Sequence, residues 1–501
     1  MPYPPRVRLA SRLTLAALAI LAAAAPAWGQ GFDSTKTPAT AVPAARWGQL
    51  EPRAILGDTS WWNFGSTPTD LHPFFHDLDV ENGWLFASTG RGLMVWDLRT
   101  DPANPTRTAY AFAGPKDRKP SPVPDWHQND TKFYLFGVDA PAGVDSVVGM
   151  ACISGNGFLI WDTRDKANPR LLYQDDSKEG TQVYAATLGG RHYGFYAATS
   201  DRVLVYDLSA ALQLPGPAAC MDASPASTPC TGGGAKVYVG KLATASGASY
   251  VAGVGTYLAV AAGSGVEIWQ VADPRAATRV FTVSGVGFVK GVAMWQQGSS
   301  YYLAAVDIAG KALKIYDLSC LAGGSCASAP QIGSFPLTTT NGSDYLYVTF
   351  SRRGTTPFLY VGGDNQFGGG AQREFLLDVS NPASPTDITP KADASGYWGW
   401  YYYGNPTGFN WVMPRFGKFY GDHLYRAAFS VIDVHAYAGA LPPAAGFGWN
   451  PAEVYPGTPV TFIDQSTGNV TSWSWTFQDG TPATSSLESP GTVTFATEGN
   501  K

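Results

Sequence analysis

Val95-Trp96-Asp97-Leu98 is the first of seven similar tetrapeptides, each with two apolar residues followed in six of the seven copies by aspartate. The other six copies are Ile160-Trp161-Asp162-Thr163, Val205-Tyr206-Asp207-Leu208, Ile268-Trp269-Gln270-Val271, Ile315-Tyr316-Asp317-Leu318, Leu376-Leu377-Asp378-Val379 and Val431-Ile432-Asp433-Val434. They recur at intervals of 45 to 65 residues. Self-similarity at such a period predicts repeated units that stack or close on one another.

Each unit reads as a series of short strands. An apolar run precedes the tetrapeptide, such as Trp84–Ala87 or Phe195–Ala198. These runs are rich in the aromatic and β-branched residues that suit a pleated sheet. Glycines separate the runs, as in Gly90-Arg91-Gly92, and Asn82-Gly83 is a strong hairpin signal ahead of Trp84. The unit therefore predicts three strands and a looser fourth.

Four-stranded antiparallel units of this length predict an all-β, seven-bladed β-propeller over residues 61–440. Radial closure removes most of the open strand edges that a flat sheet would expose. The alternative is two or three stacked β-sandwiches, whose strands would not carry one phrase at one place in every unit. Residues 30–60 would form an N-terminal segment that supplies an outer strand and closes the ring with the last blade.

Most units continue past the tetrapeptide into an Asp/Asn-Pro turn, for example Asp101-Pro102. With this turn, the stretch from His76-Asp77-Leu78 to Asp97-Leu98 and the stretch Leu376–Pro382 resemble the LVIVD-repeat family of secreted bacterial proteins. The resemblance covers about residues 70–437, although most units lack the His-Asp start. It implies a propeller fold and brings no assigned activity. The chain is not similar to WD-repeat proteins, because the Gly-His element is missing.

The first 29 residues have the pattern of a secretory signal peptide. Arg6, Arg8 and Arg12 form a basic region, and Leu13–Ala25 is an apolar core too short for an ordinary membrane span. Small residues in Ala27-Trp28-Gly29 place cleavage before Gln30. We therefore expect a secreted, extracellular or cell-surface protein without a transmembrane segment; the alternative is a retained membrane anchor.

The charge balance argues against a nucleic-acid partner. The net charge is −5, and removal of three arginines with the leader makes it about −8. A mildly acidic chain with scattered basic residues binds nucleic acid poorly. With 45% hydrophobic and 15% charged residues, the chain can bury large cores.

Five cysteines are present. Cys220 and Cys230 flank one loop, and Cys320 and Cys326 flank another, so we expect two local disulfides after secretion. Cys152 lies in an apolar run and is expected to be a buried thiol. Zinc is disfavoured, because neither pair has two-residue spacing and no histidine is near.

Residues 446–501 differ in sequence pattern from the propeller repeats and follow a stiff linker at 441–445. Alternation of Trp473, Trp475 and Phe477 with polar residues predicts a strand with one buried face. Together with Asp479-Gly480, this stretch resembles the signature of PKD domains, which are Ig-like β-sandwiches; Gln478 stands where the family has glycine. Small sandwiches need about 80 residues or more. We therefore expect this domain to be truncated and the sequence to be a fragment.

No catalytic motif stands out, and we assign no catalytic residue and no cofactor. The long insertion that holds Asp125, Trp126 and His127 is either a binding or metal site or a solvated loop. His76 is either a metal ligand near the axis or a structural hydrogen-bonding group. Asp364 beside three glycines leaves calcium possible, with a polar hairpin tip as the alternative.

The densest aromatic stretch lies near the end of the predicted propeller. Its candidate ligand-binding residues are Trp398, Trp400, Tyr402 and Trp411. Exposed tryptophan and tyrosine make stacking platforms for sugar rings or protein partners. The alternative is that these side chains pack between blades six and seven.

Three functions follow as hypotheses. The first is a binding or adhesion module that presents propeller loops to a glycan or protein partner outside the cell. The second is an extracellular polysaccharide lyase or hydrolase with its site at the propeller channel; the sequence favours a non-enzyme, because it has six histidines and no spaced catalytic motif. The third is a structural part of a larger multidomain surface protein. Fold alone does not choose among them.

Overall fold

The computed structural model describes residues 7–8, 50–56, 75–89, 92–112, 135–152, 157–175, 179–199, 202–214, 237–263, 265–287, 289–324, 326–337, 344–364, 374–389, 416–427, 432–437, 445, 447–450, 453–464, 472–487 and 490–498. All regular structure in these ranges is β, apart from the short helix α2 (Leu208–Ala211) and the 3₁₀ turn η6 (Ser319–Gly323). The all-β prediction is confirmed.

Residues 50–437 form four-stranded antiparallel sheets, and each sheet is a meander of strands that are consecutive in the chain, except in the last. The first three sheets are β3 (Asp77–Glu81), β4 (Trp84–Ser88), β5 (Gly92–Asp97) and β6 (Thr106–Phe112); β7 (Leu135–Asp139), β8 (Val147–Cys152), β9 (Phe158–Asp162) and β10 (Arg170–Asp175); and β11 (Gly180–Leu188), β12 (Arg191–Ala198), β13 (Val203–Asp207) and β14 (Tyr238–Leu242). The next two are β15 (Ala248–Val254), β16 (Tyr257–Ala262), β17 (Gly265–Gln270) and β18 (Thr278–Val283); and β19 (Val289–Gln297), β20 (Ser300–Asp307), β21 (Ala312–Asp317) and β22 (Gln331–Pro336).

The last two sheets of this region are β23 (Asp344–Arg353), β24 (Thr356–Asp364), β25 (Phe375–Asp378) and β26 (Thr386–Asp387); and β27 (Phe416–Tyr420), β28 (His423–Ala427), β29 (Ile432–Tyr437) and β2 (Leu50–Leu56). In the last sheet β2 comes from the N-terminal part of the chain and pairs antiparallel with β29, with Leu50 opposite Tyr437. The first six tetrapeptides of the sequence repeat fall at the end of the third strand of their sheets, from β5 to β25. The seventh falls at the start of β29, and its Val431 lies outside the described residues.

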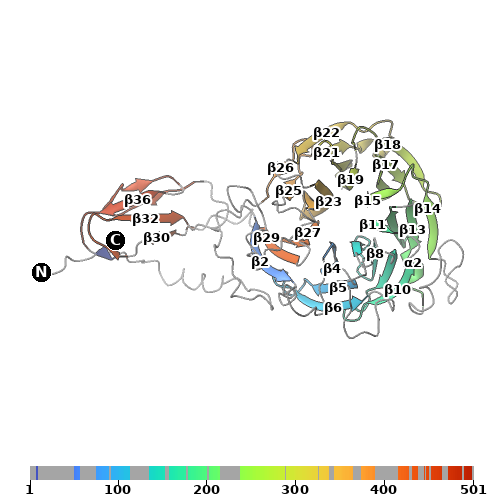
Figure 1. Ribbon diagram of the computed structural model, residues 1–501, viewed down its shortest axis with the longest axis horizontal. Helices are drawn as coiled ribbons and strands as arrows, with labels where there is room; N and C mark the ends of the chain where they lie inside the picture. The colour runs from blue at the N-terminus through green and yellow to red at the C-terminus, as the bar shows by residue number, and fades with distance from the viewer. Residues whose placement is uncertain are drawn as a thin grey trace, which may run out of the picture.

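The sheets stand radially around a common axis (Figure 1), which confirms the β-propeller prediction over stacked sandwiches. The first strand of each sheet lies innermost. Each innermost strand contacts the next one round the ring, from β3 to β7 and onward, and β27 contacts β3.

Apolar side chains between neighbouring sheets form the core. The second strands β4 and β16 and the third strands β9 and β13 are buried along their whole length. Both faces of such strands pack against other sheets, which is why they read as continuous apolar runs and not as alternating ones. Phe86 and Val95 of the first sheet thus share one cluster with Met150 and Trp161 of the second.

A separate four-stranded sheet follows in the C-terminal region, with strand order β30 (Phe447–Asn450), β32 (Pro459–Asp464), β36 (Gly491–Phe495) and β34 (Gly480–Thr481). Beside it, β33 (Trp475–Thr476) pairs with β35 (Thr484–Ser485), and β31 (Glu453–Val454) pairs with β1 (Val7–Arg8). Phe477 is buried in the core of this region, and Trp475 packs against it, as the alternation predicts.

The structure tests the expectations about the cysteines only in part. Cys320 and Cys326 form a disulfide with their Cα atoms 5.2 Å apart, whereas Cys220 and Cys230 lie outside the described residues. Cys152 ends β8, and its side chain is not among those described. Among the described residues, none of the helices has the length and apolar character needed to cross a membrane.

Candidate functional site

A cavity of about 600 Å³ lies at the propeller axis, and the innermost strand of each propeller sheet described above contributes to its lining. Its walls differ in character. Strands β15 and β19 present mainly apolar residues, such as Ala252, Val254 and Met294, whereas β3, β7 and β27 present ionisable ones. The cavity is therefore polarised across the axis: the first, second and last sheets carry its acidic groups and Lys418, and β23 contributes Arg352.

The acidic wall begins in β3, where Asp77, Asp79 and Glu81 alternate with apolar residues. Because side chains two apart share one face of a strand, all three carboxyl groups point the same way. Each accepts a hydrogen bond from a backbone N–H in or just after the innermost strand of the next sheet. These bonds are Val138 N to Asp77 Oδ2 at 3.1 Å, Ala140 N to Asp79 Oδ2 at 2.9 Å and Gly143 N to Glu81 Oε2 at 2.7 Å.

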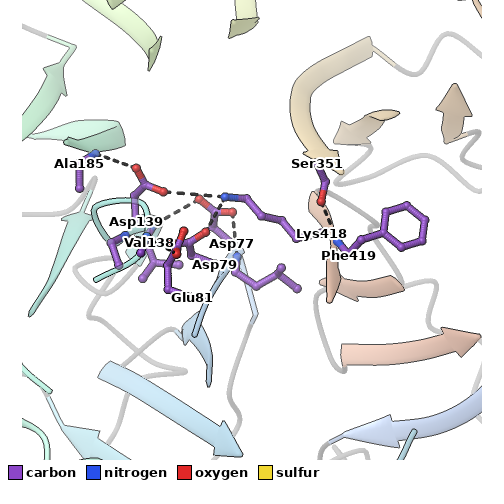
Figure 2. Close-up of polar contacts among 12 residues, drawn as sticks. Asp77, Asp79, Glu81, Val138, Asp139, Ala185, Ser351, Lys418 and Phe419 are labelled. Carbon is purple, nitrogen blue, oxygen red and sulfur yellow. Dashed lines mark hydrogen bonds and ion pairs between the residues drawn. The ribbon is translucent and has the colours of Figure 1, made fainter. Parts of the chain in front are cut away.

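Lys418 reaches from β27 toward these carboxylates and links the last sheet to the first two (Figure 2). Its Nζ lies 2.5 Å from Asp79 Oδ1 and 3.9 Å from Asp139 Oδ1. Asp139 in turn accepts a hydrogen bond from Ala185 N of β11 at 2.7 Å. One ammonium group thus forms ion pairs with two carboxylates from different sheets.

Burial and mutual repulsion shift the titration of this cluster. Burial raises the pKa of Asp77 to about 7. Burial and the charge of Asp79 raise the pKa of Glu81 to about 7 and that of Asp139 well above its ordinary value. Burial opposes ionisation of Lys418, but the charges of Asp79 and Asp139 outweigh it and raise the pKa of the ammonium group. Lys418 therefore stays charged at neutral pH, while Asp77 and Glu81 have pKa values of about 7.

Uncharged polar groups complete the wall on the side of β11 and β15. Gln182 Nε2 donates to Asp77 Oδ2 at 3.1 Å and to the Tyr250 hydroxyl at 3.3 Å. Among the described residues, Gln182 Oε1 and Thr349 Oγ1 are buried without a hydrogen-bond partner, and both residues line the cavity. Buried polar atoms usually find a partner, so these two atoms mark places where a ligand or water would bind.

A second buried charge cluster joins β24, β28 and β29 away from the cavity. The fully buried Arg426 donates through Nε to Asp433 Oδ1 at 2.8 Å and also bonds Glu374, which accepts from Tyr360. Burial raises the pKa of Glu374 to about 7, whereas the charge of Arg426 outweighs burial and lowers the pKa of Asp433. Since its charges are paired inside the protein and it does not line the cavity, we interpret it as structural.

The repeated aspartates have a structural role. In five of the seven tetrapeptides the side-chain oxygen accepts the backbone N–H two residues later, which closes a turn; these residues are Asp97, Asp162, Gln270, Asp317 and Asp378. Asp207 instead caps α2 by accepting from Ala210 N, and Asp433 belongs to the buried arginine cluster.

Most of the residues nominated from the sequence fall outside the described residues: Asp125, Trp126, His127, Trp398, Trp400, Tyr402 and Trp411. Asp364 ends β24 opposite Asp344, and its side chain is not described. His76 is buried directly before β3, and its backbone N–H donates to Ser88 O at 3.1 Å. Among the described residues, no group of three or more His, Cys, Asp or Glu side chains is arranged to hold a metal ion.

Sequence reasoning missed Asp79, Glu81, Asp139 and Lys418 as site residues. The signal in the sequence was the acid at every second position of residues 77–81, because an innermost strand with three acids on one face is unusual in an otherwise apolar repeat. Asp139 and Lys418 carry no comparable local signal.

Comparisons with known proteins give similarity of structure only. No protein-family model matches the chain, and no curated protein does. Similar solved structures include a chain of the mitotic checkpoint complex, with 13% identity, a TM-score of 0.47 and coverage of 81% of this chain and 97% of that one. Another is the β-propeller domain of Cps50 (Swd1) from Myceliophteria thermophila, with 11% identity, a TM-score of 0.45 and coverage of 74% and 98%. A third is the computationally designed Ika8 protein, with 11% identity, a TM-score of 0.39 and coverage of 73% and 97%.

Proposed function

We propose that this chain is a secreted or cell-surface binding module, built as a seven-bladed LVIVD-like propeller followed by an Ig-like PKD segment. Its partner is a glycan or a protein outside the cell. The leader-like N-terminus supports secretion, and the matching third strands support a blade for every copy of the tetrapeptide. The Trp-x-Trp-x-Phe strand supports the PKD assignment.

The observation that carries the proposal is the axial cavity. Its volume of about 600 Å³ lies within the range of about 300–1,000 Å³ that small-ligand sites occupy. Apolar walls and a few convergent polar groups are the usual composition of such sites. The side chains that line it stand on strands held in place by neighbouring sheets, so the site is largely pre-formed and binding orders few groups.

The experiment is a glycan and peptide array probed with the purified chain and three variants. Asp139→Asn alters the cavity, the double variant Trp398→Ala/Trp400→Ala alters the aromatic stretch, and Lys241→Met changes an exposed lysine on β14 as a control. We expect hits that survive in the control and weaken in the cavity variant, with melting temperatures unchanged. Hits lost only in the aromatic variant would move the binding surface to the loops, and an array without hits would contradict the proposal.

A second candidate function is favoured by one specific observation. The enzyme hypothesis requires acidic or basic side chains that converge at the axis, and Asp77, Glu81, Asp139 and Lys418 do converge there. Carboxyl groups whose pKa is about 7 suit general acid catalysis near neutral pH.

A polysaccharide panel tests this candidate. The reducing ends released and the ultraviolet absorbance of an unsaturated product distinguish hydrolysis from elimination. Turnover that disappears in Glu81→Gln, with the fold intact, would establish an enzyme. Absence of turnover on substrates that the array shows to bind would contradict the enzyme and leave the binding module as the supported function.

A further inference from the structure

We propose that the axial cavity binds a small organic cation, with the ligand's ammonium group seated between Glu81 and Asp139. This inference rests on the proposed binding function and names the chemical class of the ligand. It follows from the charge on the cavity wall, from unpartnered oxygen atoms in the same wall, and from the size of the space.

The charges that line the cavity are unevenly distributed. Three carboxyl groups line it, from Asp77, Glu81 and Asp139, and two basic groups, from Lys418 and Arg352. Lys418 is in closest contact with Asp79, which lies behind it and is 1% exposed. Its ammonium group is 2.5 Å from that carboxylate and 3.9 Å from Asp139, so its charge is already largely neutralised.

Arg352 does not balance the acidic wall either. It belongs to β23, and its guanidinium donates to the backbone carbonyls of Gln296 and Thr355. Its partners therefore lie on its own side of the ring. The carboxyl groups of Glu81 and Asp139 are left with backbone N–H donors and without a full counter-charge.

Unpartnered acceptors provide a second, independent observation. Gln182 is 8% exposed, and within the described part of the chain no donor reaches its Oε1. Thr349 Oγ1 is in the same situation on β23. An ammonium group has three N–H donors and no acceptor, so it is suited to carboxylates and unpartnered oxygen acceptors.

The geometry favours an organic cation over a metal ion. No cluster of three or more ligating side chains suited to a metal is present among the described residues. A divalent metal ion would also meet about twice the repulsion from the charge of Lys418 that a monovalent ammonium group meets at the same distance. A cavity of about 600 Å³ has room for a ligand of monosaccharide to disaccharide size.

The test compares matched pairs of compounds by isothermal titration calorimetry with the full chain. Glucosamine is compared with glucose, and 1,4-diaminobutane with 1,4-butanediol, so that within each pair amino groups replace hydroxyl groups. Calcium chloride is a separate arm. We expect each amine to bind at least tenfold more tightly than its neutral counterpart, and calcium not to compete with it.

Variants place the binding in the cavity. Asp139→Asn and Glu81→Gln keep an acceptor for the backbone N–H but remove the charge, and each should weaken amine binding at least tenfold. Asp422→Asn is the control, because that carboxylate is 66% exposed and pairs with Arg353 outside the cavity. Melting temperatures equal to that of the parent chain show that each variant is folded.

Three results would overturn the inference: equal affinity for an amine and its neutral counterpart, unchanged amine affinity in both folded cavity variants, or calcium displacing the amine. Absence of binding by either amine would also overturn it. The array experiment is independent of all four results. Array hits without amine binding would contradict the organic-cation ligand but support the binding module. If neither the array nor the titrations show binding, the proposed function is contradicted as well.

Discussion

Replacement of Lys418 by methionine tests whether the axial charge cluster holds the first, second and last sheets together. The methionine keeps most of the volume of the lysine stem but removes the ammonium group from Asp79 and Asp139. Asp79 is 1% exposed, so its carboxylate is left in a site that water hardly reaches. We therefore expect Lys418→Met to destabilise the propeller.

The size of the effect follows from the burial of the pair. Removal of one partner of a buried ion pair costs about 3–5 kcal/mol. The Lys418 side chain is 23% exposed, which places the expected loss near the lower end, about 3 kcal/mol. For a propeller of about 390 residues, an unfolding entropy of about 2.1 cal/mol/K per residue converts this loss to a fall in Tm of about 4 °C.

The loss should depend on pH in a definite direction. Lys418 stays charged from pH 5 to pH 8, because its pKa is raised above the ordinary lysine value. Without it the pKa of Asp139, which burial and Asp79 already raise, rises further. A carboxyl group whose folded pKa exceeds its unfolded value loses its stabilising contribution as pH rises. The destabilisation should therefore be largest at pH 8 and smaller at pH 5, where protonation removes the unpaired charge.

The assay is thermal unfolding followed by circular dichroism at both pH values, with Lys241→Met as the control. Lys241 is exposed on the outer strand β14, and its replacement should change stability by no more than about 0.5 kcal/mol. A Lys418→Met variant that melts within about 1 °C of the parent at pH 8 would refute the reasoning, since about 4 °C is expected. An equal loss at both pH values would refute the assigned role of the carboxylates.

Three more predictions follow from other contacts. Burial and the charge of Asp79 raise the pKa of Glu81 to about 7, so its contribution to stability is full below about pH 4 and is lost as pH rises through 7; Glu81→Gln should flatten the fall in stability between pH 5 and pH 8 in urea titrations. Asp317→Ala should cost about 1 kcal/mol in the same assay because it leaves Ser319 N without its acceptor, whereas Asp317→Asn should cost little. Replacing both Cys320 and Cys326 by serine should lower stability by about 2 kcal/mol, and a reducing agent should then have no further effect on that loop.

The architecture was predictable because one short phrase has the same physical task in most units. The tetrapeptide marks a buried third strand. The side chain at the aspartate position closes the turn that leads from this strand to the fourth. Gln270 shows that this task, and not the acid, is what recurs. Its Oε1 accepts the N–H of Ala272 at 2.9 Å, as Asp97 Oδ1 accepts that of Arg99.

The axial site was not predictable in the same way, because contact between the first and last sheets assembles it from distant parts of the chain. Asp79 and Lys418 are 339 residues apart and come from the first and last sheets. No local pattern identifies Lys418 among the other lysines. No spaced motif along the chain signals the ionisable groups at the axis, because contact between the first and last sheets is what brings them together.

The contrast between the two halves of the ring argues that the acidic wall exists for more than assembly. Two pairs of neighbouring innermost strands elsewhere are linked by neutral hydroxyl groups. Thr181 Oγ1 donates to Ser249 O at 2.6 Å, and Ser351 Oγ accepts the N–H of Phe419 at 2.8 Å. Such hydroxyl links join sheets without the desolvation cost of a buried carboxylate, which is several kcal/mol per ion. The first sheet nevertheless buries Asp77 and Asp79 at the acidic wall of the axial cavity. These acids link the sheets, but burying them beside a cavity at a cost to stability is also the pattern expected of a binding or reacting site.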